Sequence, residues 1–186
     1  MGHRLSKIVT RTGDDGTTGL GDGARVAKDA PRIVAMGDID ELNSAVGCVL
    51  AGAVPEPVRL ALAAVQNDLF DLGGEVCIPG REAMADRHVA RLDGAIEALN
   101  AGLPPLKEFV LPGGDAAAAS CHLARATCRR AERSLVALSH REAVSPSALR
   151  YLNRLSDLLF VSARVINRAR ARHETLWKPG DAVKAP

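Results

Sequence analysis

An apolar stripe with helical spacing is the feature that most limits what this chain can fold into. Apolar side chains recur in alternating steps of four and three along one stretch, at Val58, Leu62, Val65, Leu69, Leu72 and Val76. These steps place the side chains on one face of a helix, which is buried only when other helices cover it. Because 47% of the residues are hydrophobic and only 3% are aromatic, the core is expected to be aliphatic. An all-α fold is therefore expected.

The same periodicity predicts five helical segments after residue 30. The first is expected over 31–53, the second opens at Pro57, and the others cover about 89–99, 115–138 and 145–173. Glycines and prolines from Gly73 to Gly80 are expected to break the chain before the third segment. Asp115 and Ser145 stand where helix N-caps are expected. Short connections between long helices favour an antiparallel bundle of four to five helices.

The chain is expected to form one domain, because its 186 residues carry no internal repeat and no boundary in composition. It divides into an N-terminal segment (1–30), a helical region (31–173) and a tail (174–186) that is expected to be disordered from Pro179. A net charge of +2 is too small to indicate a nucleic-acid partner. No stretch has the length and apolarity of a membrane span or a secretory leader, so a cytoplasmic protein without a membrane partner is expected.

The cysteines predict neither disulfides nor a zinc site. All four lie in apolar helical contexts without a CxxC pair, namely Cys48, Cys77, Cys121 and Cys128. This pattern is typical of small buried side chains in a reducing compartment.

The stretch from Thr10 to Asp29 has the composition of an anion-binding loop. Its twenty residues include five glycines and four threonines, together with Arg11, Arg25 and Lys28. Glycine allows backbone N–H groups to turn toward an oxyanion, and hydroxyls and cations add donors and charge. The segment matches neither GxxxxGK(S/T) nor GxGxxG, so a P-loop or Rossmann site is disfavoured. A loop that binds a polyphosphate is favoured over a flexible N-terminal tail, although disordered tails have a similar composition.

The tract LARATCRRAERSL places a second set of charges on one helix. Arg125, Arg129, Glu132 and Arg133 share one side of it, and Arg130 points elsewhere. A carboxylate among several guanidinium groups can orient them around an anion. The alternative is a solvated face on which Glu132 pairs with Arg129.

Three other positions are candidates for function. Asn153 is a poor residue for a helix interior, which indicates a hydrogen-bonding role in LNRLSDLLFVSAR. Asp40, in GDIDELNSAVG, is a candidate for metal ligation or for a salt bridge to an arginine of another helix or subunit. Phe109, in FVLPGG, is either a core anchor or an aromatic side chain placed against a flat ligand.

Together these segments resemble the PduO-type ATP:cob(I)alamin adenosyltransferases. The match consists of TRTGDDGTTGLGDGARVAKD, GDIDELNSAVG, FVLPGG, ARATCRRAER and LNRLSDLLFVSAR, in this order. The resemblance implies a five-helix bundle that forms a homotrimer, with ATP held by an ordered N-terminal segment and the corrinoid lying between bundles. It also implies the reaction, in which cob(I)alamin attacks C5′ of ATP and inorganic triphosphate leaves.

The resemblance also implies roles for individual residues. ATP would be bound by Thr10, Arg11, Thr12, Gly13, Thr17, Thr18 and Lys28, and from the neighbouring subunit by Arg129, Arg130, Glu132, Arg133 and Asn153. Arg129 would neutralise the departing triphosphate together with Mg²⁺, which the ATP phosphates carry. Asp40 and Arg125 would bridge subunits beside the corrinoid. Phe109 would displace the lower axial ligand of cobalt, which makes cob(II)alamin easier to reduce.

Some features are left without a role or with alternatives. Asp15 stands where family members often carry Lys, and it is expected to face solvent; residues 78–88 and the five histidines are given no catalytic role. The family implies a flavoprotein reductase and an adenosylcobalamin-dependent enzyme as partners. Two other functions stay open: a carrier that delivers adenosylcobalamin, and a helical anion-binding interaction module.

Overall fold

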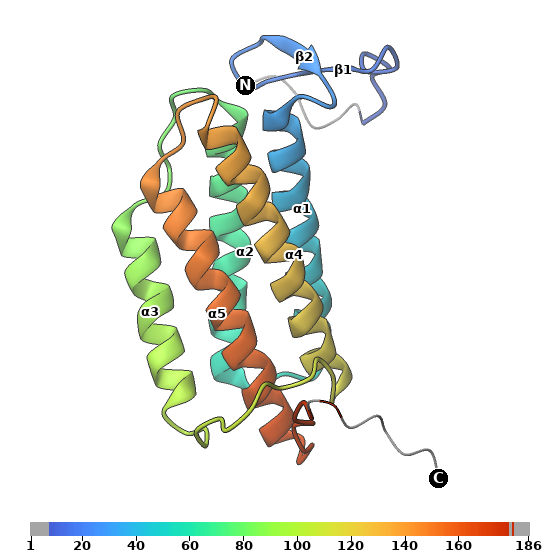
Figure 1. The fold of residues 1–186 in the computed structure, drawn as a ribbon. Helices are drawn as coiled ribbons and strands as arrows, with labels where there is room; N and C mark the ends of the chain where they lie inside the picture. The colour runs from blue at the N-terminus through green and yellow to red at the C-terminus, as the bar shows by residue number, and fades with distance from the viewer. Residues whose placement is uncertain (1–7, 179, 181–186) are drawn as a thin grey trace.

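The computed structural model describes residues 8–178 and 180, and in them it contains five helices and two short strands. The helices are α1 (Pro31–Leu50), α2 (Glu56–Cys77), α3 (Asp86–Asn100), α4 (Ala116–Ser139) and α5 (Pro146–Ala169). They run antiparallel along one axis; α1 packs against α2 and α4, and α5 packs against α4 and α3 (Figure 1). The prediction of an all-α bundle is confirmed.

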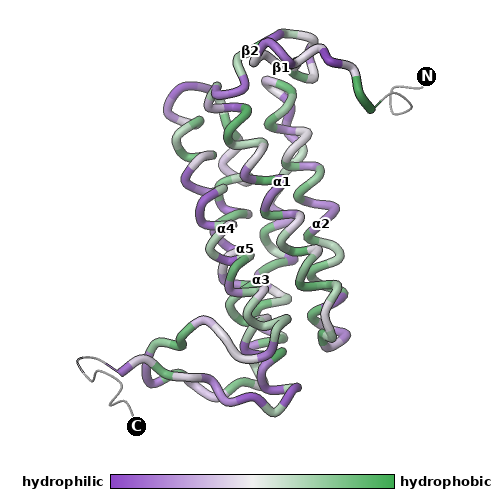
Figure 2. The backbone as a smooth tube through the Cα atoms, turned by 90° about the vertical axis from the view of Figure 1, so that its right-hand side faces the viewer, coloured by the Kyte–Doolittle hydropathy of each residue, from purple (hydrophilic) through white to green (hydrophobic). Residues whose placement is uncertain are grey.

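The apolar stripe on α2 lies in the core, as predicted. Four of its six residues are 0% exposed, and Leu69 and Val76 are 1% and 4% exposed. Hydrophobic residues also recur along the other helices (Figure 2). Helix α4 contributes mainly small buried side chains, among them Ala118, Ala124 and Ala131, which allow α1 and α5 to approach it closely on both sides.

One buried polar cluster crosses this core. The Tyr151 side chain is 0% exposed, and its hydroxyl donates a hydrogen bond of 2.8 Å to the Asp68 carboxylate. Arg91 pairs with the same carboxylate, so the cluster joins α5, α2 and α3. Because a buried hydroxyl or carboxylate without a partner is unfavourable, the three side chains satisfy one another.

The predicted N-caps are confirmed, but two helix ends differ from expectation. The side chains of Asp115 and Ser145 accept hydrogen bonds from the N–H groups of Ala117 (3.0 Å) and Ala148 (3.1 Å). Helix α1 ends at Leu50, before residue 53, and α5 ends at Ala169, before residue 173. The α5 helix cannot continue because Ala171 has a φ of 52°, in the left-handed region.

The expectation that Gly73 and Gly74 interrupt the chain is wrong. Both lie inside α2, which continues to Cys77. Tertiary packing of the stripe offsets the low helix propensity of two glycines.

The prediction that all four cysteines are buried holds for only two of them. Cys121 and Cys128 are 0% exposed, and burial raises the pKa of the Cys121 thiol to about 12. Cys48 is exposed and Cys77 is partly exposed. Apolar neighbours in sequence do not bury a residue that lies on the outer face of its helix.

A short hairpin precedes the bundle and was not predicted. Strands β1 (Thr17–Gly19) and β2 (Arg25–Ala27) pair antiparallel, with Thr18 opposite Val26. Strands of three residues carry too little periodic signal to be recognised. The hairpin lies beside the N-terminal end of α1 (Figure 1).

Two sequence expectations concern the ends of the chain and membrane spans. The tail predicted to be disordered falls on residues 179 and 181–186, which lie outside the described residues. Among the described residues, none of the helices has the length and apolarity needed to span a membrane.

Candidate functional site

The glycine- and threonine-rich segment forms an ordered, tightly turned loop rather than an extended tail. The Gly16 N–H donates to the Gly13 carbonyl (3.2 Å), and the Lys28 N–H donates to the Gly16 carbonyl (2.9 Å). Gly16 and Gly23 have φ values of 81° and 93°, which glycine adopts without strain. These bonds fold the segment back on itself, so that Gly13, Gly16 and Lys28 lie close together.

Three of the residues predicted to bind the nucleotide meet at Gly13. A Cβ at Gly13 would lie 3.0 Å from the Thr17 carbonyl oxygen and 3.2 Å from Nζ of Lys28. A larger residue would therefore press on the opposite strand and on the ammonium group. The loop brings together Gly13, Thr17 and Lys28, and the Thr10 and Thr12 hydroxyls lie 3.0 Å apart next to them.

Arg25 serves the loop's own structure. Its guanidinium donates to the Thr12 carbonyl (2.6 Å) and to the Thr17 hydroxyl, and it lies 3.6 Å from the Asp15 carboxylate. Hydrogen bonds from the Thr17 hydroxyl and N–H lower the pKa of Asp15. Asp15 is 67% exposed and faces solvent, as expected, while it also fixes the start of β1. The cation expected to contact a ligand here is therefore Lys28 more than Arg25.

The loop is docked on the bundle through Gly21. Its N–H donates to the Cys77 carbonyl at 3.0 Å, and a Cβ at this position would lie 2.4 Å from Cγ1 of Ile78. Only glycine fits this close approach without movement of Ile78. The contact places β1 over the end of α2 and fixes the loop relative to the helices.

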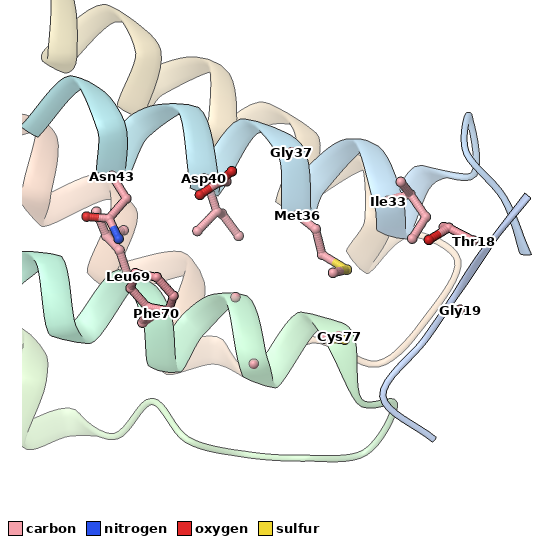
Figure 3. Close-up of a pocket in the computed structure, with 13 residues that line it drawn as sticks. Thr18, Gly19, Ile33, Met36, Gly37, Asp40, Asn43, Leu69, Phe70 and Cys77 are labelled. Carbon is pink, nitrogen blue, oxygen red and sulfur yellow. The ribbon is translucent and has the colours of Figure 1, made fainter. Parts of the chain in front are cut away.

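A cavity of about 510 Å³ lies under β1, between α1 and α2. Thr18 and Gly19 border it at the loop end, and Asp40 and Phe70 border it farther along the two helices (Figure 3). Asp40 is exposed, and the Phe70 side chain is 76% exposed, which is unusual for so large an apolar group. The cavity thus presents an apolar wall, with the loop at one end and the Asp40 carboxylate farther along α1.

Three helical glycines line this cavity, Gly37 on α1 and Gly73 and Gly74 on α2. A Cβ at Gly37 or Gly73 would meet no atom within 4 Å, so both positions border open space, whereas a Cβ at Gly74 would lie 3.4 Å from the Arg81 guanidinium. Met36, Phe70 and these glycines were not identified from the sequence as residues of a cavity. The available signal was Phe70, a bulky residue outside the buried stripe and close to a glycine pair within a helical pattern.

On α4 the predicted polar face exists, but its partners differ from the expected pair. Glu132 accepts a hydrogen bond from the Asn153 amide of α5 (3.1 Å), and Arg133 donates to the Arg129 carbonyl (3.0 Å). Within residues 8–178 no ion pair joins Glu132 to Arg129, and the Arg129 side chain is exposed. The contact between Glu132 and Asn153 brings two candidate residues from different helices together.

Arg130 points away from that face, as predicted. Its guanidinium lies 3.1 Å from the Asp38 carboxylate and also pairs with Glu41, both on α1. In one chain this arginine joins α4 to α1.

Phe109 and Arg125 share a second cavity, of about 450 Å³. Phe160 of α5 also lines it, and the Phe109 side chain is 76% exposed. The interpretation of Phe109 as a core anchor is therefore wrong; the loop between α3 and α4 holds it outside the core. Phe160 is backed by His122, which is 3% exposed and whose pKa is lowered by burial and by Arg125.

Part of the predicted tail pairs with the Phe109 loop. Val110 and Leu176 form an antiparallel bridge, and the Trp177 N–H donates to the Phe109 carbonyl (2.8 Å). The Trp177 ring lies edge-on to the Phe109 ring, with centroids 6.3 Å apart. Residues 174–177 therefore support the aromatic side chain that lies over the cavity.

One chain does not bring all candidate residues together. The N-terminal loop lies at one end of the bundle, and the loop between α3 and α4, which carries Phe109, lies at the other (Figure 1). Among the described residues, no ion pair joins Asp40 to Arg125. In the same part of the chain, no group of three His, Cys, Asp or Glu side chains is arranged to hold a metal ion.

Comparison with known proteins gives a consistent result. The family described as cobalamin adenosyltransferase matches residues 8–166. A cobalamin adenosyltransferase of Cupriavidus metallidurans is 58% identical over 96% of this chain and 97% of its own length. A corrinoid adenosyltransferase of Mycobacterium tuberculosis is 48% identical over 97% of both chains.

The solved structures agree with this in fold. A variant PduO-type ATP:corrinoid adenosyltransferase from Lactobacillus reuteri, complexed with cobalamin and ATP, superposes with a TM-score of 0.87 at 31% identity. The superposition covers 93% of this chain and 97% of that chain. Another variant from this organism, complexed with ATP, gives a TM-score of 0.85 at 31% identity and covers 92% and 100% of the two chains.

The exposure of Phe109 leads to a prediction about stability. Phe109→Ala should lower the free energy of unfolding by at most about 1.5 kcal/mol, the upper value for one aromatic pair. Leu152→Ala on α5, where Leu152 is 0% exposed, should cost about 2–5 kcal/mol and serves as the buried control. Urea unfolding of both variants checks this, and equal losses would contradict the exposed position of Phe109.

Proposed function

Because this chain belongs to the cobalamin adenosyltransferase family, we propose that its N-terminal loop and its two cavities serve one reaction. The chain is an ATP:corrinoid adenosyltransferase, which transfers the 5′-deoxyadenosyl group of ATP to the cobalt of cobalamin. The observation that carries the assignment of the site is the ordered loop around Gly13 and Lys28, docked beside an apolar cavity.

In this reaction the triphosphate is the leaving group. The reduced cobalt of cob(I)alamin supplies an electron pair to C5′ of ATP; a Co–C bond forms, the C5′–O bond breaks, and its electrons leave with the triphosphate. The protein must grip the phosphates and expose C5′, whereas a P-loop exposes the γ-phosphorus. This difference explains why the loop has glycines, threonines and Lys28 but no P-loop motif.

The loop is proposed to bind ATP through residues of one segment, of which Gly13, Thr17 and Lys28 already lie together. Lys28 would contact the phosphates, and hydroxyl and backbone N–H donors would surround them. These donors belong to Thr10, Arg11, Thr12, Gly13, Thr17 and Thr18. The closeness of Nζ of Lys28 to Gly13 and the turn at Gly16 support this arrangement.

A second subunit is proposed to complete the nucleotide site. Arg129 would neutralise the charge that develops on the departing triphosphate, in concert with Mg²⁺. Arg130, Glu132, Arg133 and Asn153 would contribute from the same neighbouring chain. Two observations support this proposal. The hydrogen bond between Asn153 and Glu132 holds two of these side chains together, and the exposure of Arg129 leaves its guanidinium accessible to a ligand.

The corrinoid is proposed to lie between the two kinds of cavity, from adjacent subunits of a homotrimer. Asp40 borders one cavity and Arg125 borders the other, so an ion pair between subunits would join the two walls. Phe70 and Phe109 are each 76% exposed, and a flat ligand or a neighbouring chain would cover them. Phe109 would then occupy the lower axial side of cobalt.

The remaining partners follow from the chemistry of the substrates. Mg²⁺ would arrive with ATP, bound by its phosphates. Cob(I)alamin is a strong reductant, so the protein would work in a reducing compartment such as the cytoplasm, with a flavoprotein reductase supplying electrons to cob(II)alamin. The product would pass to an adenosylcobalamin-dependent enzyme.

The direct test is an absorbance trace of cob(I)alamin mixed with ATP and this protein, because alkylation of cobalt changes the spectrum. We expect the adenosylcobalamin spectrum to appear with equal amounts of inorganic triphosphate. A protein that binds adenosylcobalamin without releasing triphosphate over many turnovers would instead be a carrier. Binding of neither substrate would favour an anion-binding interaction module.

The two cations of the proposed nucleotide site should behave differently when removed. Lys28 contacts charge already present in ATP, so Lys28→Ala should mainly raise KM for ATP. Arg129 meets charge that grows in the transition state, so Arg129→Ala should lower kcat by about a hundredfold or more. Steady-state kinetics checks both. Arg141→Ala, which removes an exposed cation outside the site, is the control, and unchanged kcat in Arg129→Ala would exclude the assigned role.

The proposed trimer gives a complementation prediction. If each site takes Lys28 from one subunit and Arg129 from another, a mixture of Lys28→Ala and Arg129→Ala chains, assayed at ATP below the raised KM, should recover part of the activity that both variants have lost. The chains are denatured and refolded together, and light scattering reports the mass. Full activity in a monomer, or a mixture no more active than the average of its components, would contradict shared sites.

A further inference from the structure

Two nearly buried polar side chains lie one turn apart near the end of α5, and the proposed reaction uses neither. Arg164 is 5% exposed and Asn167 is 2% exposed, beside apolar residues such as Ala163 and Ile166. Burial of an amide or a guanidinium is unfavourable unless its hydrogen bonds are made. Their partners therefore indicate what these residues do.

Asn167 binds the end of the Phe109 loop with both atoms of its amide. Its Oδ1 accepts from the Asp115 N–H (2.8 Å), and its Nδ2 donates to the Gly113 carbonyl (3.1 Å). Gly114, between these partners, has a φ of 101°, and a Cβ there would lie 2.1 Å from Oδ1 of Asn167. The loop passes directly over the amide, and only glycine fits at the crossing.

Arg164 binds the beginning of the same loop and the chain that pairs with it. Its guanidinium donates to the Pro104 carbonyl (2.8 Å) and to both oxygens of Glu174, at 2.7 Å and 3.2 Å. From Glu174 the chain runs on to Leu176 and Trp177, which pair with Val110 and Phe109. The loop over residues 104–115 is thus tied to α5 at both ends, and its middle is paired with a segment tied to the same arginine.

Phe109 lies between these two attachments and has little packing of its own. Its side chain is 76% exposed, and the ring contact found for it is with Trp177, which belongs to the tied segment. The position of the ring is therefore set by the backbone on either side of it, and not by a socket in the core.

We propose that Arg164 and Asn167 are positioning residues for Phe109, which hold its ring in register over the cavity that Arg125 lines. The inference rests on the proposed role of Phe109 at cobalt. The residue types fit the task, because an amide supplies one donor and one acceptor to successive peptide groups, and a guanidinium spans a carbonyl and a carboxylate. A misplacement of about 1 Å can cost about a hundredfold in rate, so such attachments matter for catalysis.

The test uses two variants that weaken one attachment each. Asn167→Asp keeps the size and the acceptor but loses the donor to Gly113 and places a second oxygen against that carbonyl. Glu174→Gln keeps an acceptor for Arg164 but removes the charge; since Glu174 is 20% exposed, it is the milder change. Tyr151→Phe, which removes a buried hydrogen bond far from the loop, is the control for general loss of stability.

The first readout needs no ligand. Trp177 is the one tryptophan of the chain, so the emission spectrum reports its contact with Phe109. Asn167→Asp and Glu174→Gln should shift this emission in the folded protein, and Tyr151→Phe should leave it unchanged. An unshifted emission in both variants would overturn the proposal.

The second readout is at cobalt. With ATP bound, the wild-type protein should convert part of added cob(II)alamin to a four-coordinate form, seen by electron paramagnetic resonance, and Phe109→Ala should lose it. Asn167→Asp should lose most of this signal and lower kcat by about tenfold to a hundredfold, with KM for ATP unchanged. Combined with Phe109→Ala, it should cause no further loss, because it acts through that ring.

The outcomes separate this inference from the proposed function. If Phe109→Ala leaves the cobalt signal intact, the role of Phe109 is wrong, and the emission of Trp177 still reports whether α5 holds the loop. If Phe109→Ala loses the signal while Asn167→Asp and Glu174→Gln keep it, the positioning role is wrong and the function stands. The positioning role would also be wrong if Asn167→Asp lowered kcat by the same factor in the wild-type protein and in the Phe109→Ala variant.

Discussion

Burial of aliphatic side chains along α4, between α1 and α5, is the interaction on which the rest of the structure depends. Small residues such as Ala124 and Ala131 let the three helices approach closely, and dispersion and apolar burial hold them in one arrangement. A core of this kind uses only one face of each helix. The outer face of α4 is therefore free to carry Arg129 and Glu132 without loss of the fold.

The candidate functional residues lie on the surface of the bundle, on loops and on helix faces that the core does not use. The N-terminal loop is docked through Gly21, three glycines of α1 and α2 line the apolar cavity, and Phe109 stands on a loop tied to α5. The N-terminal loop and the loop between α3 and α4 lie at opposite ends of one chain (Figure 1). A rigid bundle cannot bend to join them, which is the physical reason for proposing sites between subunits.

Prediction from the sequence succeeded where a periodic signal was present. The buried stripe on α2 and the caps at Asp115 and Ser145 follow from spacing and from local hydrogen bonding, and the structure has them. Local rules failed where distant contacts decide. Gly73 and Gly74 look like a break in sequence but lie inside α2, Cys48 has apolar neighbours but is exposed, and the charge of Arg25 is used within its own hairpin.

The sequence by itself determined the helical architecture, the glycine- and threonine-rich composition of the N-terminal loop and the family, because periodicity, composition and ordered motifs are local properties of a chain. Only the tertiary structure excluded the interpretation of Phe109 as a core anchor, since exposure depends on what packs around a residue. It also revealed the contacts of Asn167 and Arg164. Asn167 bonds to Asp115, 52 residues away along the chain, and Arg164 bonds to Pro104, 60 residues away. No local pattern marks such contacts, because folding alone brings those groups within hydrogen-bonding distance.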